Sequence, residues 1–235
     1  MATEYGFGKT VTNGLVLSLD AADKNSYPGS GTIWRDLSGN NNNATLVSTP
    51  TFSSVNGGYI SFNGTNQYAI INSSSTLNMG SRSYTGEVWL AVRTTSASER
   101  MIYEYNIWSN NGTYQLASLT GNNITTTFPE AYVVGTQAAN YTYSPLSTNV
   151  WIYIANQFDT TNNTLRIYVN GVFAAQTTGV TQEIGNVTSN LYIMSRGGTS
   201  LFMPANLSIL KIYNQVLSAT EIAQNYNAQK SRFGL

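Results

Sequence analysis

Apolar and polar residues alternate most regularly over residues 151–176, and this alternation predicts three consecutive β-strands. In the middle run, Leu165, Ile167 and Val169 share one face, which is the two-residue period of a strand. Asn170-Gly171 separates this run from the next apolar one. Both residues tolerate the positive φ angles of a type I′ turn, so the pair predicts a tight β-hairpin.

The strand before this hairpin also alternates. Trp151, Tyr153 and Ala155 are expected on one face, and Ile152, Ile154 and Phe158 on the other. Further short strands are predicted at 15–20, 44–47, 59–62, 67–71, 87–92, 101–105, 114–119, 131–134, 191–194 and 207–213. We expect 59–62 and 67–71 to pair as a hairpin around Asn63-Gly64. Strict alternation over the last strand puts Leu207, Ile209, Lys211 and Tyr213 on one face.

One helix is predicted, at Ala219–Gln229. Ser218 and Glu221 have the spacing of a capping box, and Leu217 and Ile222 occupy the two positions of a hydrophobic staple. Many short strands with frequent turns and one terminal helix predict an all-β fold. We therefore expect a two-sheet antiparallel jelly-roll sandwich with a short C-terminal α-helix. Residues 1–12 are expected to be an N-terminal arm, and residues 13–235 a single domain.

Composition narrows the classes of function. Apolar residues make up 41% of the chain, enough for a sizeable core, whereas charged residues make up only 9% and their net charge is zero. No long-range field would attract nucleic acid or an anionic membrane, so we expect neither as a partner. The sequence contains no cysteine and no histidine, which removes the commonest general base and the usual zinc ligands. The first residues lack a basic segment followed by an apolar run, so we expect no secretory signal peptide.

Five segments, 14–23, 34–46, 59–71, 151–176 and 207–228, together resemble the laminin-G-like branch of the concanavalin A-like lectin/glucanase jelly rolls. The resemblance covers nearly the whole chain and implies two antiparallel sheets. It includes LDA, DLSGN and the closing basic-aromatic residues KSRFGL, which together are similar to domains in predicted tailed-phage proteins, marine phages included. Those domains occur in virion surface proteins such as capsid decorations or fibres.

Calcium-binding members of that family carry acidic residues at two places. The matching positions here hold Asn63, Asn66 and Gln67 in one segment and Asn206, Ser208 and Ile209 in the other. Calcium favours several oxygen ligands that include carboxylates. We therefore expect no cofactor, and calcium is disfavoured.

Catalytic members of the superfamily place clustered carboxylates on one strand, spaced E-x-D-x-E. No predicted strand here carries two acids at that spacing. Glu99 and Glu104 would face opposite sides of a continuous strand. Asp20, Asp23 and Asp36 lie near strand ends, where turn and cap roles are the simpler interpretation. We expect no catalytic or metal-binding residues and no enzymatic activity; a glycan hydrolase is a remote third hypothesis.

Aromatic and amide side chains are the remaining candidates for a binding site. In sugar-binding sites, the sugar ring often stacks on an aromatic side chain, while amide side chains form hydrogen bonds with the sugar hydroxyl groups. Candidate glycan or partner contacts are Tyr103, Tyr105, Trp108, Asn110 and Tyr114. The alternative interpretation is that these residues fill a sheet face or a subunit contact. Trp34, Trp89 and Trp151 are expected in the core.

The main hypothesis is a non-enzymatic virion structural protein, a capsid decoration or fibre component. It would be made in the host cytoplasm, reside on the virion surface, form a homo-oligomer and dock to the major capsid or fibre protein. The alternative is a carbohydrate-binding or adhesion module that recognises surface glycans of the host during attachment.

Overall fold

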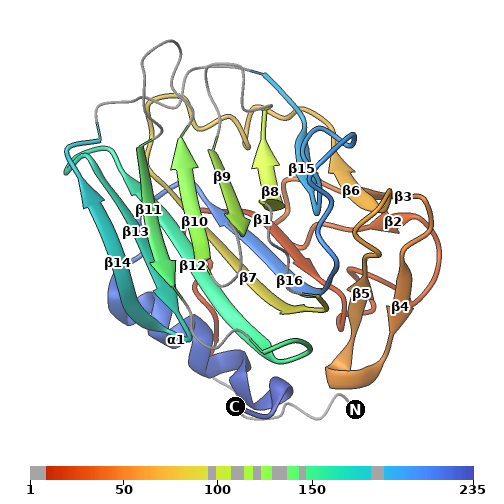
Figure 1. Ribbon diagram of the computed structural model, residues 1–235. Coiled ribbons are helices and arrows are strands. Elements are labelled where there is room, and N and C mark those ends of the chain that lie inside the picture. The colour runs from red at the N-terminus through yellow and green to blue at the C-terminus, as the bar shows by residue number, and fades with distance from the viewer. Residues whose placement is uncertain are drawn as a thin grey trace.

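The computed structural model describes residues 9–94, 99–106, 114–118, 123–128, 137–142, 147–180 and 188–235. Within this part, two antiparallel eight-stranded sheets face each other (Figure 1). The expected all-β sandwich with a C-terminal helix is thereby confirmed. No helix in the described part has the length and apolar character that crossing a bilayer requires.

The first sheet, sheet A, has the strand order β14-β13-β12-β7-β16-β5-β4, with β1 also paired to β16. Its strands are β1 (Leu15–Asp20), β4 (Thr51–Ser53), β5 (Tyr59–Ser61), β7 (Tyr84–Val92), β12 (Trp151–Asp159), β13 (Thr164–Val169), β14 (Val172–Thr178) and β16 (Ala205–Tyr213).

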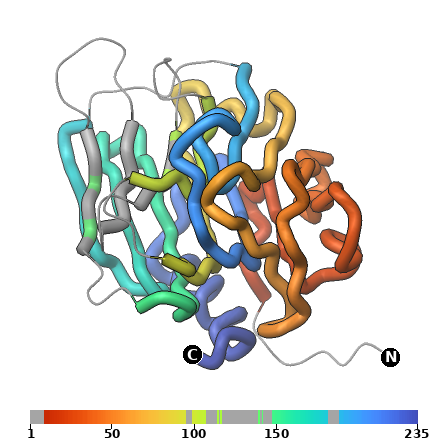
Figure 2. The backbone as a smooth tube through the Cα atoms, turned by 45° about the vertical axis from the view of Figure 1, so that its right-hand side comes forward, coloured from red at the N-terminus to blue at the C-terminus, as the bar shows by residue number. Residues whose placement is uncertain are grey.

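The second sheet, sheet B, has the order β11-β10-β9-β8-β15-β6-β3-β2. Its strands are β2 (Ile33–Trp34), β3 (Ala44–Val47), β6 (Tyr68–Ile71), β8 (Arg100–Tyr105), β9 (Tyr114–Ser118), β10 (Asn123–Phe128), β11 (Gln137–Thr142) and β15 (Leu191–Ile193). The tube view in Figure 2 shows the two layers from a second side. The strand predicted at 131–134 lies outside the described residues, and β10 and β11 were not predicted.

The predicted Asn170-Gly171 hairpin is present between β13 and β14. Asn170 has φ 49° and Gly171 φ 77°, the positive values expected of this turn. A Cβ atom on Gly171 would lie 2.9 Å from the ring of Tyr226, so the turn packs closely against the C-terminal helix. Glycine is therefore required here for its conformation and for its size.

The predicted pairing of 59–62 with 67–71 is wrong. β5 pairs with β4 and β16 in sheet A, whereas β6 pairs with β3 and β15 in sheet B. Residues 63–67 cross from one layer to the other instead of closing a hairpin. The Asn63 side-chain oxygen accepts hydrogen bonds from the backbone N–H groups of Thr65, Asn66 and Gln67, which folds the crossing segment on itself.

The strict alternation predicted for 207–213 is also wrong, because β16 contains a bulge between Leu207 and Ile209. An extra residue at a bulge shifts the side chains that follow to the other face. Leu207 therefore packs in the core between the sheets, while Ile209 and Tyr213 pack on the outer face of sheet A.

Helix α1 (Ala219–Gln229) has the predicted bounds and the predicted capping box between Ser218 and Glu221. It lies on the outer face of sheet A (Figure 1). There it covers a second apolar core, the outer aromatic cluster, which comprises Trp89, Trp151, Tyr153, Tyr226 and Phe233. The alternation of β12 explains both cores, because Ile152, Ile154 and Phe158 point between the sheets and Trp151, Tyr153 and Ala155 point outward.

Tyrosines occupy much of the core between the sheets. Tyr103 donates a hydrogen bond to the Asn156 side-chain oxygen, and the Asn156 amide donates to the Tyr84 hydroxyl over 2.9 Å. The ring of Tyr114 lies 4.9 Å from that of Tyr84, centroid to centroid. Burial raises the pKa of the Tyr84, Tyr103 and Tyr114 hydroxyls above the ordinary value of 10.0.

These raised pKa values predict alkaline unfolding. The unfolded chain releases tyrosine protons near pH 10, whereas the folded chain retains them. The stability that these groups contribute is therefore fully present below pH 10 and is lost as the pH rises above it. We expect the absorbance at 295 nm to show that the buried tyrosines ionise only together with loss of the near-ultraviolet circular dichroism. A gradual ionisation of all tyrosines without unfolding would contradict this prediction.

Candidate functional site

The structure places three of the predicted contact residues in the interior. Tyr103, Tyr105 and Tyr114 have no exposed surface. Their hydroxyls bond to Asn156, to the Ser189 backbone N–H and to the Leu77 carbonyl, respectively. The alternative interpretation, residues that fill a sheet face, therefore describes these three tyrosines. Trp108 and Asn110 lie outside the described residues, so for them glycan or partner contact stays a prediction.

Glu99 and Glu104 converge on one cation, contrary to the expectation that they face opposite sides. The Arg196 guanidinium lies 3.2 Å from a Glu99 carboxylate oxygen and 3.1 Å from one of Glu104. The expectation assumed a continuous strand, but β8 begins only at Arg100 and has a bulge between Met101 and Tyr103. The two acids are thus held by an arginine in an ion-pair cluster.

The aspartates near strand ends accept hydrogen bonds from backbone N–H groups. One Asp36 oxygen accepts hydrogen bonds from the N–H groups of Ser18 and Ser38, and Asp20 accepts one from Ala22 and pairs with Arg232 at 2.9 Å. Asp23 accepts one from the Asn25 N–H group. These are the turn and cap roles expected from the sequence.

The family's calcium positions hold residues whose polar atoms already bind each other. The Asn63 amide donates to the Asn66 side-chain oxygen over 2.9 Å, and the Gln67 amide nitrogen donates to the Ser48 and Thr49 carbonyls. In the other segment, Ser208 contacts the Arg232 guanidinium. Amide N–H groups and a guanidinium are positively polarised hydrogen-bond donors, whereas a calcium ion needs oxygen ligands. Among the described residues, no cluster of three or more acidic side chains could hold a metal.

A different set of aromatic residues is available at the surface. Tyr68 on β6, Tyr192 on β15 and Phe202 in the following loop are all partly exposed. The Tyr68 ring centroid lies 6.4 Å from that of Tyr192 and 6.3 Å from that of Phe202. We call these three residues the aromatic face.

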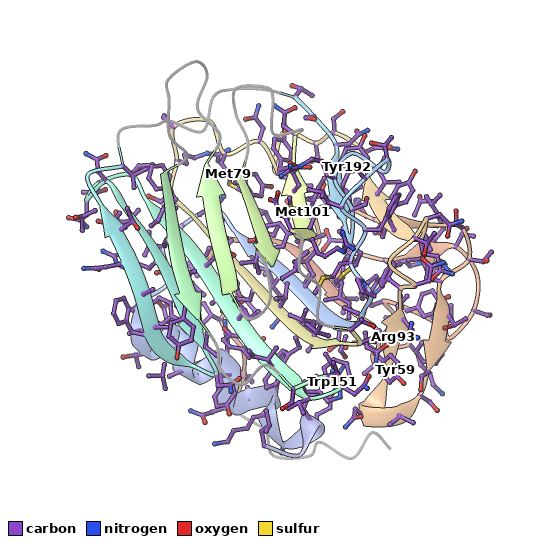
Figure 3. All side chains as sticks on the ribbon, in the orientation of Figure 1. Tyr59, Met79, Arg93, Met101, Trp151 and Tyr192 are labelled. Carbon is purple, nitrogen blue, oxygen red and sulfur yellow. The ribbon has the colours of Figure 1, made fainter. Side chains whose placement is uncertain are left out.

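Strand alternation positions the aromatic face. The neighbours of Tyr68 and Tyr192 in sequence, Ala69 and Ile193 among them, point into the core between the sheets. The two tyrosines therefore point out of sheet B. Tyr192 lies opposite Glu104 in the register of β15 with β8, which brings the ion-pair cluster beside the aromatic face. Figure 3 shows Tyr192 near β15 and β8, well away from Trp151.

The loop after β15 completes this surface. Arg196 and Ser200 bond to each other through their backbones and form a tight turn. A Cβ atom on Gly198 would lie 2.8 Å from the Tyr68 ring, so only glycine lets the turn approach this closely. The Arg196 side chain then reaches the two glutamates from the same turn. The result is a surface of three aromatic rings flanked by fixed charges.

Sequence reasoning missed the aromatic face, although a signal was available. The predicted strands 67–71 and 191–194 place an apolar residue on one face and a tyrosine on the other. The sequence alone does not tell whether the ring of a tyrosine on the outer face of a sandwich strand is exposed to solvent or covered by a loop. The pairing of β6 with β15, which brings the two tyrosines together, joins segments that are far apart in sequence.

The fold is a two-sheet antiparallel jelly-roll sandwich. Residues 63–223 match the laminin-G-like family described as the concanavalin A-like lectin/glucanases superfamily. The chain belongs to this superfamily. No curated protein is similar enough in sequence to count as a relative.

Solved structures with the same fold include binding domains of bacterial toxins. The binding domain of Paraclostridial Mosquitocidal Protein 1 aligns with a TM-score of 0.75 and 17% identity, over 92% of this chain and 52% of that one. The binding domain of Botulinum Neurotoxin DC in complex with SialylT gives 0.72 and 14%, over 93% and 52%. The Botulinum Neurotoxin serotype G binding domain gives 0.72 and 19%, over 92% and 51%. The chain thus spans about half the length of each, and these identities establish the fold alone.

Proposed function

We propose that the chain is a non-catalytic carbohydrate-binding module that recognises surface glycans through the aromatic face. The observation that carries the proposal is the grouping of three partly exposed rings, Tyr68 and Tyr192 on sheet B and Phe202 in the adjoining loop. An aromatic ring offers an apolar face that suits the C–H face of a pyranose, and the tyrosine hydroxyls supply hydrogen bonds. The similar structures are binding domains of toxins, which supports binding in preference to catalysis.

The ion-pair cluster supports this role by holding the loop in place. Arg196 is mostly buried, with 17% of its side chain exposed, and Glu104 is fully buried. A guanidinium that bridges two carboxylates fixes its own side chain and the turn that carries it. A binding surface that is rigid before the ligand arrives loses less entropy on binding. The same engagement of Glu99 and Glu104 by an arginine disfavours the pair as a hydrolytic acid and base.

Removal of a ring from the aromatic face is expected to abolish most glycan binding. On a glycan array followed by calorimetry, Tyr192→Ala and Tyr68→Ala should each weaken binding at least tenfold, because the stacking surface is lost. Phe173→Ala is the matched control, since Phe173 is an aromatic residue 49% exposed on β14 in the other sheet. Unchanged binding in both tyrosine variants, or equal loss in the control, would rule the aromatic face out.

A second candidate function is the docking of the chain at a virion surface as a capsid decoration or fibre component. Strand β14 at the edge of sheet A favours it, because β14 has no charged residue and exposes 68% of Val172 and 49% of Phe173. Exposed apolar side chains on an uncharged edge strand suit a protein partner or a second copy of the chain. Mass spectrometry and cryo-electron microscopy of particles that contain the chain would test this role. If the chain is found only free of particles, the virion role fails.

A further inference from the structure

A pocket of about 320 Å³ lies at the edge of the sandwich, between the loop 27–32 that precedes β2 and the residues 46–52 that lead from β3 of sheet B to β4 of sheet A. It is separate from the aromatic face, with which it shares no lining residue. Tyr27, Leu46, Pro50 and Phe52 form its apolar walls. We call it the edge pocket.

Two aromatic rings shape the edge pocket. The centroids of Tyr27 and Phe52 lie 5.5 Å apart with the rings tilted by 50°. The Tyr27 hydroxyl donates a hydrogen bond of 2.8 Å to the Gly31 carbonyl, which folds the loop around the pocket. Phe52 is only partly buried, so part of its ring remains available to a ligand.

The rim of the edge pocket is polar and uncharged. Ser30, Thr32 and Thr49 are exposed there and offer hydroxyl groups, and Gly29 and Gly31 expose backbone. No charged residue is among those that line it. Apolar walls with a few polar groups at the mouth are the usual composition of a small-molecule site. The absence of charge in the lining favours a neutral ligand.

The backbone beside the edge pocket is strained. Thr49 has φ 52° and Ser48 has φ 59°, a left-handed region that side chains other than glycine seldom adopt. Thr49 is β-branched and also precedes Pro50, which disfavours this conformation further. The Gln67 amide holds the arrangement by donating to both carbonyls, over 3.1 Å to Ser48 and 3.0 Å to Thr49. Strain that the surrounding structure maintains is concentrated at functional sites.

We infer that the edge pocket is a second carbohydrate subsite, which binds one neutral hexopyranose unit. Its two tilted rings suit the apolar face of a single pyranose, and its hydroxyl-bearing rim suits the hydroxyl groups of the sugar. The absence of a cation in the lining disfavours sialic and uronic acids. This inference rests on the proposed function, and it adds a second point of attachment for a branched or extended glycan.

Nuclear magnetic resonance with ¹⁵N-labelled protein tests this inference directly. Methyl glycosides of glucose, galactose and mannose are the probes. Sialyllactose is the charged comparison, and N-acetyltryptophanamide is the apolar, peptide-like comparison. We expect a neutral hexoside to shift the backbone amides of Gly29 and Gly31 in a saturable way. Phe52→Ala should weaken this response at least fivefold. Ser30→Trp should do the same by filling the mouth of the pocket from an exposed position, with little demand on the core.

The variants separate failure of this inference from failure of the proposed function. Sugar binding that survives Phe52→Ala and Ser30→Trp but not Tyr192→Ala would overturn the edge pocket and leave the aromatic face standing. Shifts that persist in Tyr192→Ala and vanish in Ser30→Trp would support the edge pocket alone. Glycine shifts caused by sialyllactose or N-acetyltryptophanamide in preference to the neutral hexosides would overturn the assigned ligand class. No response of Gly29 and Gly31 to any neutral hexoside would overturn the edge pocket, whereas a glycan array without a hit would overturn the proposed function.

Discussion

Replacement of Trp89 by alanine is expected to lower the free energy of unfolding by about 3–5 kcal/mol, the usual cost of removing a large buried aromatic side chain. Trp89 is fully buried, and its ring stacks on Phe233 at 4.2 Å and on Tyr226 at 5.6 Å between centroids. Its indole N–H donates to the Gln229 side chain over 2.9 Å. All three partners belong to the C-terminal segment, so the variant should also release α1 from sheet A.

Denaturant unfolding measures the loss of stability, and hydrogen exchange in residues 219–233 measures the release of the helix. Val172→Ala is the control, because this side chain is 68% exposed and its truncation should change stability by less than about 0.5 kcal/mol. A Trp89→Ala protein with unchanged exchange in α1 would show that the helix is held by other contacts.

Replacement of Asn156 by alanine is expected to cost about 2–4 kcal/mol, because each buried hydrogen bond lost costs about 1–3 kcal/mol. Asn156 is fully buried between the sheets and is bonded to both Tyr103 and Tyr84. Those two hydroxyls come from different sheets, β8 in sheet B and β7 in sheet A. The asparagine thus joins the two layers through polar contacts.

A double-mutant cycle separates this hydrogen bonding from packing. Tyr103→Phe removes a hydroxyl and keeps the ring, so it should cost less in the Asn156→Ala background than in the natural chain. We expect a coupling energy of at least about 0.5 kcal/mol from denaturant unfolding. Strictly additive effects would mean that the two side chains contribute independently.

Local sequence signals led to the most reliable predictions. The Asn170-Gly171 turn and the capping box of Ser218 and Glu221 depend on residues a few positions apart, and both are present in the structure. The two faces of β12 also follow from alternation, because each face meets its own apolar core. The fold class follows from the sum of such elements.

Predictions that depend on distant partners were less reliable. Asn63-Gly64 looks like a hairpin turn, but whether β5 pairs with β6 depends on competition from β16 and β4. In β8, every residue of the MIYEY run is buried, the charged Glu104 included, so both faces of the strand are covered. One-dimensional alternation therefore could not separate the buried tyrosines 103 and 105 from surface ones, and it could not show Arg196 between two glutamates.

The pairing of β1 with β16 has a consequence for synthesis in the cell. Leu15 lies opposite Tyr213, so β1 leaves the ribosome long before the strand with which it pairs. Until then the nascent chain must carry β1 unpaired and the outward aromatic rings of sheet A uncovered, which are conditions that favour aggregation. Translation of β16 should therefore be the step that commits this sandwich to its native state, and stalling of the ribosome shortly before it should make the chain dependent on chaperones.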